Sequence, residues 1–461
     1  MTTLRFHGSA AVLLLPLALF VAVTARLFIS DAAFDLTGLA AAGVLTLFSG
    51  SLLAKAPSEY WKTAVRGASS ELTGTVVLIL IASGIFSAMM KASGVADGLV
   101  FLGGMLHLTG HAFTVFVLLA SSLMAAATGS SIGTLLAAMP IFFPAGVALG
   151  ADPTMLAGAV LSGAIFGDNL APISDTTIAS ALTQGAEVRD VVRTRLPYSL
   201  IAGVVSAVLF VIIGFRTSEA VTLPELVDAS YAKTLIMLVI PVIMIILMLK
   251  GWNLIGTLIV CDLVGFVLCL VFGFIEPAKM VDAAGPIGAG LTGMLNVICF
   301  SFFMFALLEM LKRSGVFDML LEKLNNASKT PRQAELVTIL LSVIGSVAIG
   351  AASISILFVG PVVRKLLQTH NIERTRGSNL MDGISTGLAG IVPYNPVGLN
   401  AVSLAIASGV VSESFSFLDY VPYNFQSWLL ILLFLLSAIT GIGRRFEKGT
   451  APAPEKPAAE E

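Results

Sequence analysis

The sequence is poor in charge, in cysteine and in histidine. Asp, Glu, Lys and Arg make up 12% of its 461 residues, about half the share typical of soluble domains. Its three cysteines, Cys261, Cys269 and Cys299, lie inside apolar runs, and its four histidines are scattered. These scarcities argue against a disulfide framework and against a histidine or cysteine metal centre. The formal net charge of −2 likewise provides no field that would attract nucleic acid.

Long apolar runs take the place of the missing charge. Apolar residues make up 57% of the chain, and they fall into runs of about 20 residues, enough to cross a hydrocarbon layer roughly 30 Å thick. We therefore expect an all-α polytopic membrane protein, surrounded by lipid in the bacterial cytoplasmic (inner) membrane. The first run, Ser9–Phe28, could also be a signal peptide, because Val23-Thr24-Ala25 resembles a cleavage site.

The chain repeats itself at an offset of 221 residues. Five of seven positions match between Lys91–Asp97 and Lys312–Asp318. The same offset pairs the glycines and prolines that punctuate the apolar runs: Gly129 with Gly350, Pro140 with Pro361, and Pro172 with Pro393. Because punctuation that agrees over such a length indicates an internal duplication, the first apolar run belongs to a repeat. We expect it to be retained as a membrane span.

Each half contains three plain spans, a hairpin, a broken span and a last plain span. In the first repeat, 1–218, these are scaffold helices within 9–90, a re-entrant hairpin of two half-length helices over 111–149, a broken helix over 153–185 and a last helix over 196–215. In the second repeat, 225–446, they are scaffold helices within 231–312, a hairpin over 335–369, a broken helix over 378–408 and a last helix over 427–443. Five true crossings per half are an odd number, so the second repeat should be inverted in the membrane.

The basic residues test this topology. With the N- and C-termini in the cytoplasm, 21 of the 26 lysines and arginines fall in cytoplasmic segments, Arg195 among them. The outer segments hold the other five: Arg26, Lys91, Arg216, Lys233 and Lys279. This bias has the sign that the positive-inside rule expects. The tail, 447–461, is rich in Ala, Pro and Glu, and we expect it to be a disordered cytoplasmic segment.

The break in the first broken helix carries most of the candidate chemistry. Unpaired backbone at membrane depth is tolerated only where it is buried in protein or lines a wet cavity, so the breaks indicate a central site. Six polar side chains that can bind a cation or a proton lie here: Asp168, Asn169, Ser174, Asp175, Thr176 and Thr177. A sodium ion prefers oxygen ligands, and we place it at Asp168 and Asp175. A carboxylate that binds either sodium or a proton is the simplest basis for antiport, although Asp168 and Ser174 could instead cap the half-helices.

The hairpin tips and the second break add polar groups but no acid. The first tip has Thr128, Gly129, Ser130, Ser131 and Thr134, and the second has Ser353 and Ser355. The second break has Tyr394 and Asn395. For each hydroxyl side chain, helix packing is as good an interpretation as contact with a substrate. The two halves are therefore chemically asymmetric, as one charged site shared between them would be.

Three more acids lie in or near apolar spans. Asp262 lies within a scaffold crossing, where a buried acid is functional by default, yet its repeat counterpart is Ala41. Asp382 opens the second broken span and is interpreted as a helix cap or as the acid of a second site. Glu309 precedes Arg313 by one turn, and we expect a local ion pair.

The first break and the first hairpin tip resemble a known family. The run Gly163–Thr177, with Gly167-Asp168-Asn169-Leu170-Ala171-Pro172 and Ser174-Asp175-Thr176-Thr177, is similar to the signature of the NhaC-type sodium/proton antiporters. Ala127–Thr134 resembles the family's hairpin tip, Pro393-Tyr394-Asn395 its P-W-N, and Val421-Pro422-Tyr423 its later P-Y segment. The resemblance implies scaffold helices that carry a mobile transport domain with elevator-like alternating access. It also implies exchange of sodium for protons, in some members coupled to organic acids such as malate and lactate.

The chain also departs from that pattern. Asn169 replaces the family's usual lysine, Ala171 replaces a serine, and Pro396 follows Asn395 where the family has a hydroxyl residue. The second hairpin tip, from Gly350, lacks the family's acid, and Asp382 alone stands for a pair of acids. We expect a member that transports an organic substrate to vary mainly in this second half.

These observations favour a secondary transporter without a cofactor and without enzymatic activity. The first hypothesis is a sodium/proton antiporter or sodium-linked exchanger. The alternative is a sodium- or proton-coupled carrier of a small organic solute, such as a carboxylate or an amino acid. An aspartyl protease needs two facing carboxylates, whereas Asp168 and Asp175 share one broken helix. A passive channel does not need duplicated broken helices. Transporters of this kind are commonly dimers, so we expect a homodimer.

Overall fold

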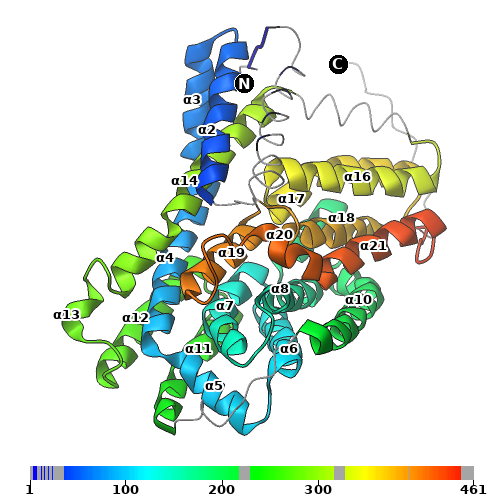
Figure 1. Ribbon diagram of the computed structural model, residues 1–461. Helices are drawn as coiled ribbons and strands as arrows, with labels where there is room; N and C mark the ends of the chain where they lie inside the picture. The colour runs from blue at the N-terminus through cyan, green and yellow to red at the C-terminus, as the bar shows by residue number, and fades with distance from the viewer. Residues whose placement is uncertain are drawn as a thin grey trace.

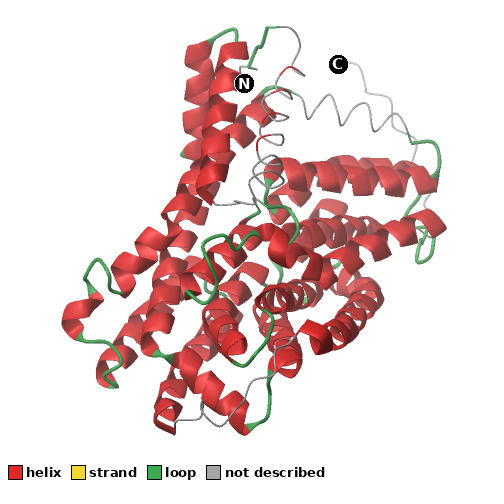
Figure 2. Cartoon of the chain, viewed as in Figure 1, coloured by secondary structure: helices red, strands yellow, loops and turns green. Residues whose placement is uncertain are grey.

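The computed structural model describes residues 4–7, 12, 15, 19, 23, 36–217, 229–315, 328–393 and 395–447. The predicted first span, 9–29, lies almost entirely outside these residues, as do the tail beyond residue 447 and Tyr394. Within them the chain is helical, and its only β contacts are two isolated bridges, Phe6 with Ala54 and Ile372 with Phe446. Figure 2 shows this all-helical architecture.

The first half of the chain contains nine described helices, and the second half contains the rest. In the first half they are α2 (Leu36–Leu53), α3 (Pro57–Ala68), α4 (Glu71–Ser93), α5 (Val95–Met105), α6 (Gly110–Thr128), α7 (Ser131–Ala148), α8 (Pro153–Leu170), α9 (Asp175–Gln184) and α10 (Val188–Thr217). In the second half they are η3 (Ala229–Leu238), α11 (Val239–Leu249), α12 (Leu254–Val271), α13 (Pro277–Met280), α14 (Pro286–Arg313), α16 (Pro331–Ile349), α17 (Ala352–Thr369), α18 (Arg374–Ala389), α19 (Pro396–Ser408), α20 (Phe417–Tyr420), η4 (Val421–Tyr423) and α21 (Phe425–Thr440).

The four predicted breaks are present, and glycine and proline set them. Both hairpins turn at a left-handed glycine, Gly129 after α6 (φ 65°) and Gly350 after α16 (φ 69°), a conformation that costs glycine nothing. The helix starts of α6, α7, α8 and α9 recur 221 residues later as the starts of α16, α17, α18 and α19. The offset found in the sequence therefore also relates the helix boundaries around the breaks.

Three details differ from the predicted elements. The hairpin arms α6 and α7 have 19 and 18 residues, about 28 Å each at 1.5 Å per residue, so they are full-length helices and not half-length ones. The last helix of the first half, α10, begins at Val188 instead of residue 196. Likewise α18 begins at Arg374, so Asp382 lies in the middle of a helix and does not open it.

The helices pack in two groups. In the first, α2, α3 and α4 pack around the long helix α14, α12 packs on α4, and α11 packs on α12. In the second, both hairpins, both broken helices, α10 and α21 pack against one another. Figure 1 shows α4, α12, α13 and α14 along one flank and the second group beside them, with α2 and α3 beyond. The groups meet where α4 contacts α7 and α19.

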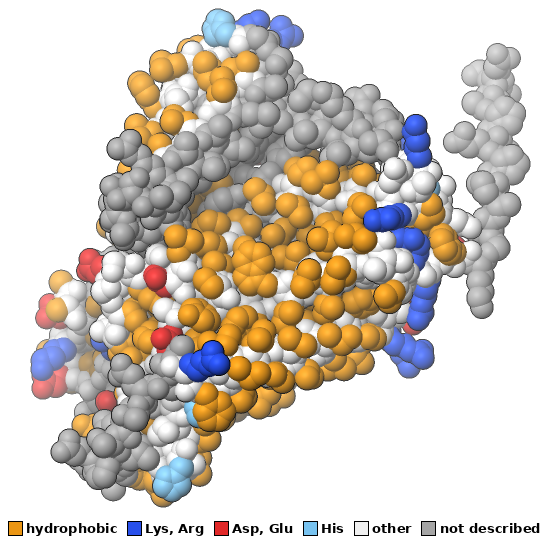
Figure 3. Space-filling model, turned by 45° about the vertical axis from the view of Figure 1, so that its right-hand side comes forward, with side chains coloured by type: hydrophobic (Ala, Val, Ile, Leu, Met, Phe, Trp, Pro, Cys, Tyr) orange, Lys and Arg blue, Asp and Glu red, His pale blue; other side chains and the backbone are white. Residues whose placement is uncertain are grey.

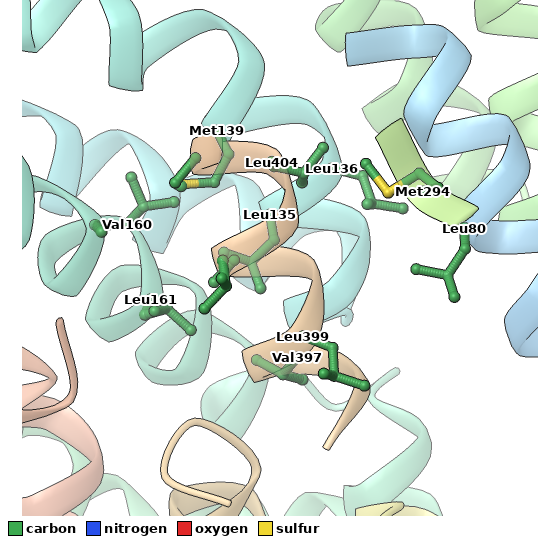
Figure 4. Packing of buried hydrophobic residues seen from close by; sticks show 14 of the residues in the cluster. Leu80, Leu135, Leu136, Met139, Val160, Leu161, Met294, Val397, Leu399 and Leu404 are labelled. Atoms are coloured by element: carbon green, nitrogen blue, oxygen red, sulfur yellow. The ribbon is translucent and has the colours of Figure 1, made fainter. Parts of the chain in front are cut away.

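The second group crosses the boundary between the halves of the chain. The hairpin arm α17 packs against α9, and the equivalent arm α7 packs against α19. Figure 4 shows the second contact: Leu135, Leu136 and Met139 of α7 lie around Leu399 and Leu404 of α19, with Val160 and Leu161 of α8, and Leu80 and Met294, nearby. These side chains are all at most 4% exposed. Among lipid tails such contacts stabilise through close packing and not through removal from water.

The described part of the chain has the lengths and composition of a multi-pass membrane protein. Eight of its helices are long and apolar enough to cross a membrane, or nine if the bent pair Phe417–Tyr423 and Phe425–Thr440 is one span. Figure 3 shows a broad apolar surface, with basic side chains gathered along its right-hand edge and most of the visible acidic ones at its left. The predicted pair between Arg313 Nε and Glu309 Oε1 is confirmed at 2.6 Å.

Candidate functional site

A cavity of about 370 Å³ lies where the two groups of helices meet. Both hairpin tips line it, together with the first break, the C-terminal half of α18 and the start of α19. The opposite wall comes from α4, α11 and α12. Its polar lining consists of Thr75, Thr128, Ser130, Ser131, Asp168, Asp175, Thr176, Ser353, Thr386 and Asn395. The four chain interruptions that the sequence predicted to form a central site therefore meet at one cavity.

Asp168 binds the tip of the first hairpin. It lies in the last turn of α8 and is 4% exposed. Its Oδ2 accepts a hydrogen bond from the Ser131 backbone N–H at 3.1 Å and another from the Ser131 hydroxyl. Ser131 is the first residue of α7, so the carboxylate lies at the positive end of that helix. The other oxygen, Oδ1, is buried and has no hydrogen-bond partner within 3.5 Å among the described residues.

Asp175 binds the tip of the second hairpin. It is the first residue of α9, and its Oδ1 accepts the Thr176 backbone N–H at 2.9 Å. Its Oδ2 accepts a hydrogen bond from the Ser353 hydroxyl, in the first turn of α17. Asp168 and Asp175 thus face one cavity from the two sides of one break, and each is hydrogen-bonded to a different hairpin.

A row of hydroxyl groups leads from the cavity into the protein. Ser174 and Thr176 share a hydrogen bond of 3.0 Å between their hydroxyl oxygens. The Thr386 hydroxyl of α18 donates to Asp382 Oδ1 at 2.7 Å, and its oxygen lies 3.5 Å from the Thr176 hydroxyl oxygen. Asp382 is therefore one hydroxyl group away from the cavity, although it does not line it.

Asp382 is paired with Arg195, a residue whose role the sequence analysis missed. Both side chains are fully buried, and Arg195 Nη1 donates to Asp382 Oδ2. Arg195 was counted above with the basic residues of cytoplasmic segments, but it lies inside the bundle on α10. Asp382 is neither a helix cap nor a cavity acid, because the ion pair and two threonine hydroxyls occupy its carboxylate. The pair joins α10 of the first half to α18 of the second.

Arg195 also holds both ends of the first break. Its Nη1 donates to the backbone carbonyl of Asn169 at 3.0 Å and to the Thr177 hydroxyl at 3.2 Å. The Asn169 side chain accepts a 2.5 Å hydrogen bond from Ser199. Asn169, Ser174 and Thr177 are therefore buried behind the cavity and do not line it. Of the six predicted residues of this break, Asp168, Asp175 and Thr176 reach the cavity.

The hairpin-tip residues divide between the cavity and the packing. Thr128, Gly129, Ser130 and Ser131 line the cavity, as does Ser353. Ser355 is buried between the arms of the second hairpin, 3.5 Å from the Ser346 hydroxyl. Thr134 is also buried and is absent from the lining. In the second break Asn395 lines the cavity while its Oδ1 accepts the Val397 backbone N–H at 3.0 Å, so it also caps α19.

Asp262 lies apart from this cavity. It is on α12, 7% exposed, and its Oδ1 lacks a hydrogen-bond partner among the described residues. The lining residue that α12 contributes is Leu254, more than two turns away along the helix. The fold therefore places this acid in the first group of helices and not at the breaks.

Gly129 sets how closely the first hairpin approaches the break. A Cβ atom here would lie 2.7 Å from Ile173 Cγ1 and 3.0 Å from the Ser174 nitrogen. We predict that Gly129→Ala slows transport severely, because the tip must move away from the break, in addition to a strain of about 1–2 kcal/mol from the left-handed backbone. Gly251→Ala is the matched control, since Gly251 is also left-handed (φ 83°) but has open space around it. Equal transport by both variants, at equal melting temperature, would contradict this role.

The cavity offers oxygen ligands of the kind that hard cations bind. The described residues contain no group of three or more His, Cys, Asp or Glu side chains that could hold a metal ion. What the cavity offers is two carboxylates, one with an unpaired oxygen, and several hydroxyl groups. Hard cations such as sodium accept such oxygen ligands, and a proton binds the same carboxylates.

Three antiporters resemble the chain over most of its length. It is 26% identical to the Na(+)/H(+) antiporter NhaC of Alkalihalophilus pseudofirmus, over 81% of this chain and 84% of the relative. It is 25% identical to the malate-2H(+)/Na(+)-lactate antiporter of Bacillus subtilis, over 82% and 83%. It is also 25% identical to the arginine/ornithine antiporter ArcD of Halobacterium salinarum, over 86% and 85%.

A family model accounts for nearly the whole chain. The model described as the Na+/H+ antiporter family matches residues 3–215 and 218–442. These stretches include both hairpins, both broken helices and every residue named above as lining the cavity. The NhaC resemblance that the first break carries is thereby confirmed. The chain belongs to the Na+/H+ antiporter family.

Proposed function

We propose that this protein exchanges sodium for protons at the cavity between the hairpin tips, as a sodium/proton antiporter or a sodium-linked exchanger. One observation carries the proposal: the unpaired Oδ1 of Asp168, a 4% exposed side chain on the cavity wall. A buried acceptor without a donor is expensive, so the site gains free energy from a proton or a cation. Because either ligand occupies the same oxygen, binding of one displaces the other.

The contacts of the two carboxylates suggest how exchange is coupled to movement. Asp168 is bound to the first hairpin through Ser131, and Asp175 to the second hairpin through Ser353. A cation at Oδ1 of Asp168 draws negative charge from the carboxylate and weakens the hydrogen bonds that Ser131 donates to Oδ2. At Asp175, both oxygens already accept hydrogen bonds, so a cation there competes directly with the Ser353 hydroxyl. Cation binding therefore changes how each hairpin is held. We propose that alternating access consists of an elevator-like movement of the second group of helices along the first.

The position of the cavity supports this movement. Thr75, Val76 and Ile79 of α4 and Met248 of α11 form one wall, whereas the ion-binding groups lie on the hairpins and broken helices. A site between two helix groups can be carried past the wall without being taken apart. We further propose inverted repeats, a homodimer formed through the scaffold, and residence in the bacterial inner membrane.

Transport by the purified wild-type protein tests the proposal. Proteoliposomes that contain a pH-sensitive dye should report proton movement when a sodium gradient is imposed, and protein-free liposomes should not. Movement in the absence of the opposing ion should be slow, since exchange requires both. A folded preparation that leaves the internal pH unchanged under every sodium gradient would refute sodium/proton exchange.

The volume of the cavity favours a second candidate, a sodium- or proton-coupled carrier of a small organic solute. A space of about 370 Å³ falls in the range of small-molecule sites, roughly 300–1,000 Å³. Two relatives named for organic exchange, of malate and lactate and of arginine and ornithine, support this candidate. Both candidates use the same carboxylates and differ in what accompanies the ion.

A further inference from the structure

We propose that the cavity accepts a small organic cation, a protonated primary amine on an aliphatic chain, and rejects organic anions. This inference rests on the proposed exchange at Asp168 and Asp175 and names a second substrate for that site. Three features of the cavity carry it: the sign of its charge, the composition of its walls and its volume.

The charge of the lining is negative. Asp168 and Asp175 line the cavity, and no Lys, Arg or His is among the described residues around it. The nearest guanidinium in the hydrogen-bond network, Arg195, is fully buried behind the cavity and paired with Asp382. An organic anion buried beside two carboxylates has no positive partner, whereas an ammonium group has two negative partners.

The starts of α7 and α9 do not reverse this sign. The positive end of α7 already receives the Asp168 carboxylate through the Ser131 N–H. The positive end of α9 carries Asp175, which accepts the Thr176 N–H. A helix terminus amounts to only about half a unit charge, so in the ionised state of both acids the two carboxylates dominate the electrostatics of the cavity.

The walls are more apolar than the binding of a bare ion requires. Eight large apolar side chains line the cavity: Val76, Ile79, Ile132, Ile173, Met248, Leu254, Ile354 and Val397. Its 370 Å³ corresponds to roughly a dozen water molecules at about 30 Å³ each. A sodium ion needs a few oxygen ligands and leaves most of this space to water beside apolar groups. In an alkylammonium ion, the alkyl chain packs against the apolar walls and the ammonium group binds the carboxylates.

The N-terminus of α17 distinguishes two kinds of amine, those with a carboxylate and those without. No side chain caps this helix, and its first residues, from Ala352 to Ile354, line the cavity. Backbone N–H groups at a free helix start bind carboxylates. Asp175 contacts this same turn through the Ser353 hydroxyl, so a carboxylate that carries no ammonium group is repelled here. A cationic amino acid such as ornithine could therefore use this end as well as the acids, while putrescine, which lacks the carboxylate, uses the acids alone.

Uptake of labelled amines tests the proposal. Isotope-labelled ornithine and labelled putrescine would be offered separately to proteoliposomes loaded with sodium, with protein-free liposomes as the control for passive entry. We expect saturable uptake of at least one amine, competition by external sodium, and no competition by lactate or malate. Asp175→Asn should weaken amine binding and raise the half-saturating amine concentration about tenfold or more, because a charged hydrogen bond is lost. Asp152→Asn, at the far N-cap of α8, should leave it unchanged.

The outcomes separate this inference from the proposed function. If sodium drives proton movement but neither amine is transported or inhibits it, the inference of an organic cation is refuted, and the proposed sodium/proton exchange is not. Uptake of lactate or malate without uptake of either amine would also overturn it. If neither sodium nor an amine is exchanged by folded protein, the proposed function fails first, and the inference fails with it.

Discussion

Asp168→Asn should abolish sodium-driven proton movement in proteoliposomes. The substitution keeps the size of the side chain and the acceptor that the Ser131 N–H uses, but it removes the negative charge and the exchangeable proton. A neutral amide oxygen binds a sodium ion more weakly than a carboxylate does, and an amide does not release a proton at physiological pH. We therefore expect proton flux within the error of protein-free liposomes, at a melting temperature within a few degrees of the wild type.

Asp152→Asn is the matched control for this experiment. Asp152 caps the opposite end of the same helix, where its Oδ1 accepts the backbone N–H groups of Thr154 and Met155 at 2.9 Å. Asparagine is as good an N-cap as aspartate, so transport should persist. Full activity of Asp168→Asn would remove Asp168 from the exchange and leave Asp175 as the cavity acid to test next.

Removing one partner of the Arg195–Asp382 pair should destabilise the protein strongly. Both side chains are fully buried, and an uncompensated buried charge costs about 3–5 kcal/mol. We expect Arg195→Met to extract poorly in detergent or to melt well below the wild type. The double substitution Arg195→Met with Asp382→Leu should recover most of that loss, because it leaves no charge behind. Thermal unfolding of the single, double and wild-type proteins measures the coupling.

The double variant should nevertheless transport poorly. Arg195 holds the Asn169 carbonyl and the Thr177 hydroxyl on the two sides of the first break, and Met supplies neither bond. The exposed pair Lys62–Glu59 is the control, since Lys62→Met should cost less than about 1 kcal/mol and leave transport intact. Single variants as stable as the wild type would show that the pair does not contribute as its burial indicates.

Much of the molecule follows from the order of its residues alone. The scarcity of charge and the lengths of the apolar runs determine a multi-pass membrane protein, because each run is long enough to cross hydrocarbon as a helix that satisfies its own backbone hydrogen bonds. Gly129, Pro172, Gly350 and Pro393 determine where the helices break, because left-handed glycine and proline end helices through local sterics. The signature around Asp168 was sufficient to identify the family. Each of these features depends on neighbours in sequence, or on a pattern that repeats along it.

Tertiary structure decided which polar residues meet. Asp382 and Arg195 are 187 residues apart, and nothing in their local sequence distinguishes a buried pair from a helix cap and a cytoplasmic arginine. The same holds for Ser353, which meets Asp175 at the cavity, and for Ser355, two residues later, which packs between hairpin arms. Which face of α17 points into the cavity depends on its packing against α9 and α18. The local sequence does not distinguish a hydroxyl side chain at the cavity from one packed between helices. Its role is therefore set by distant helices and not by its own segment.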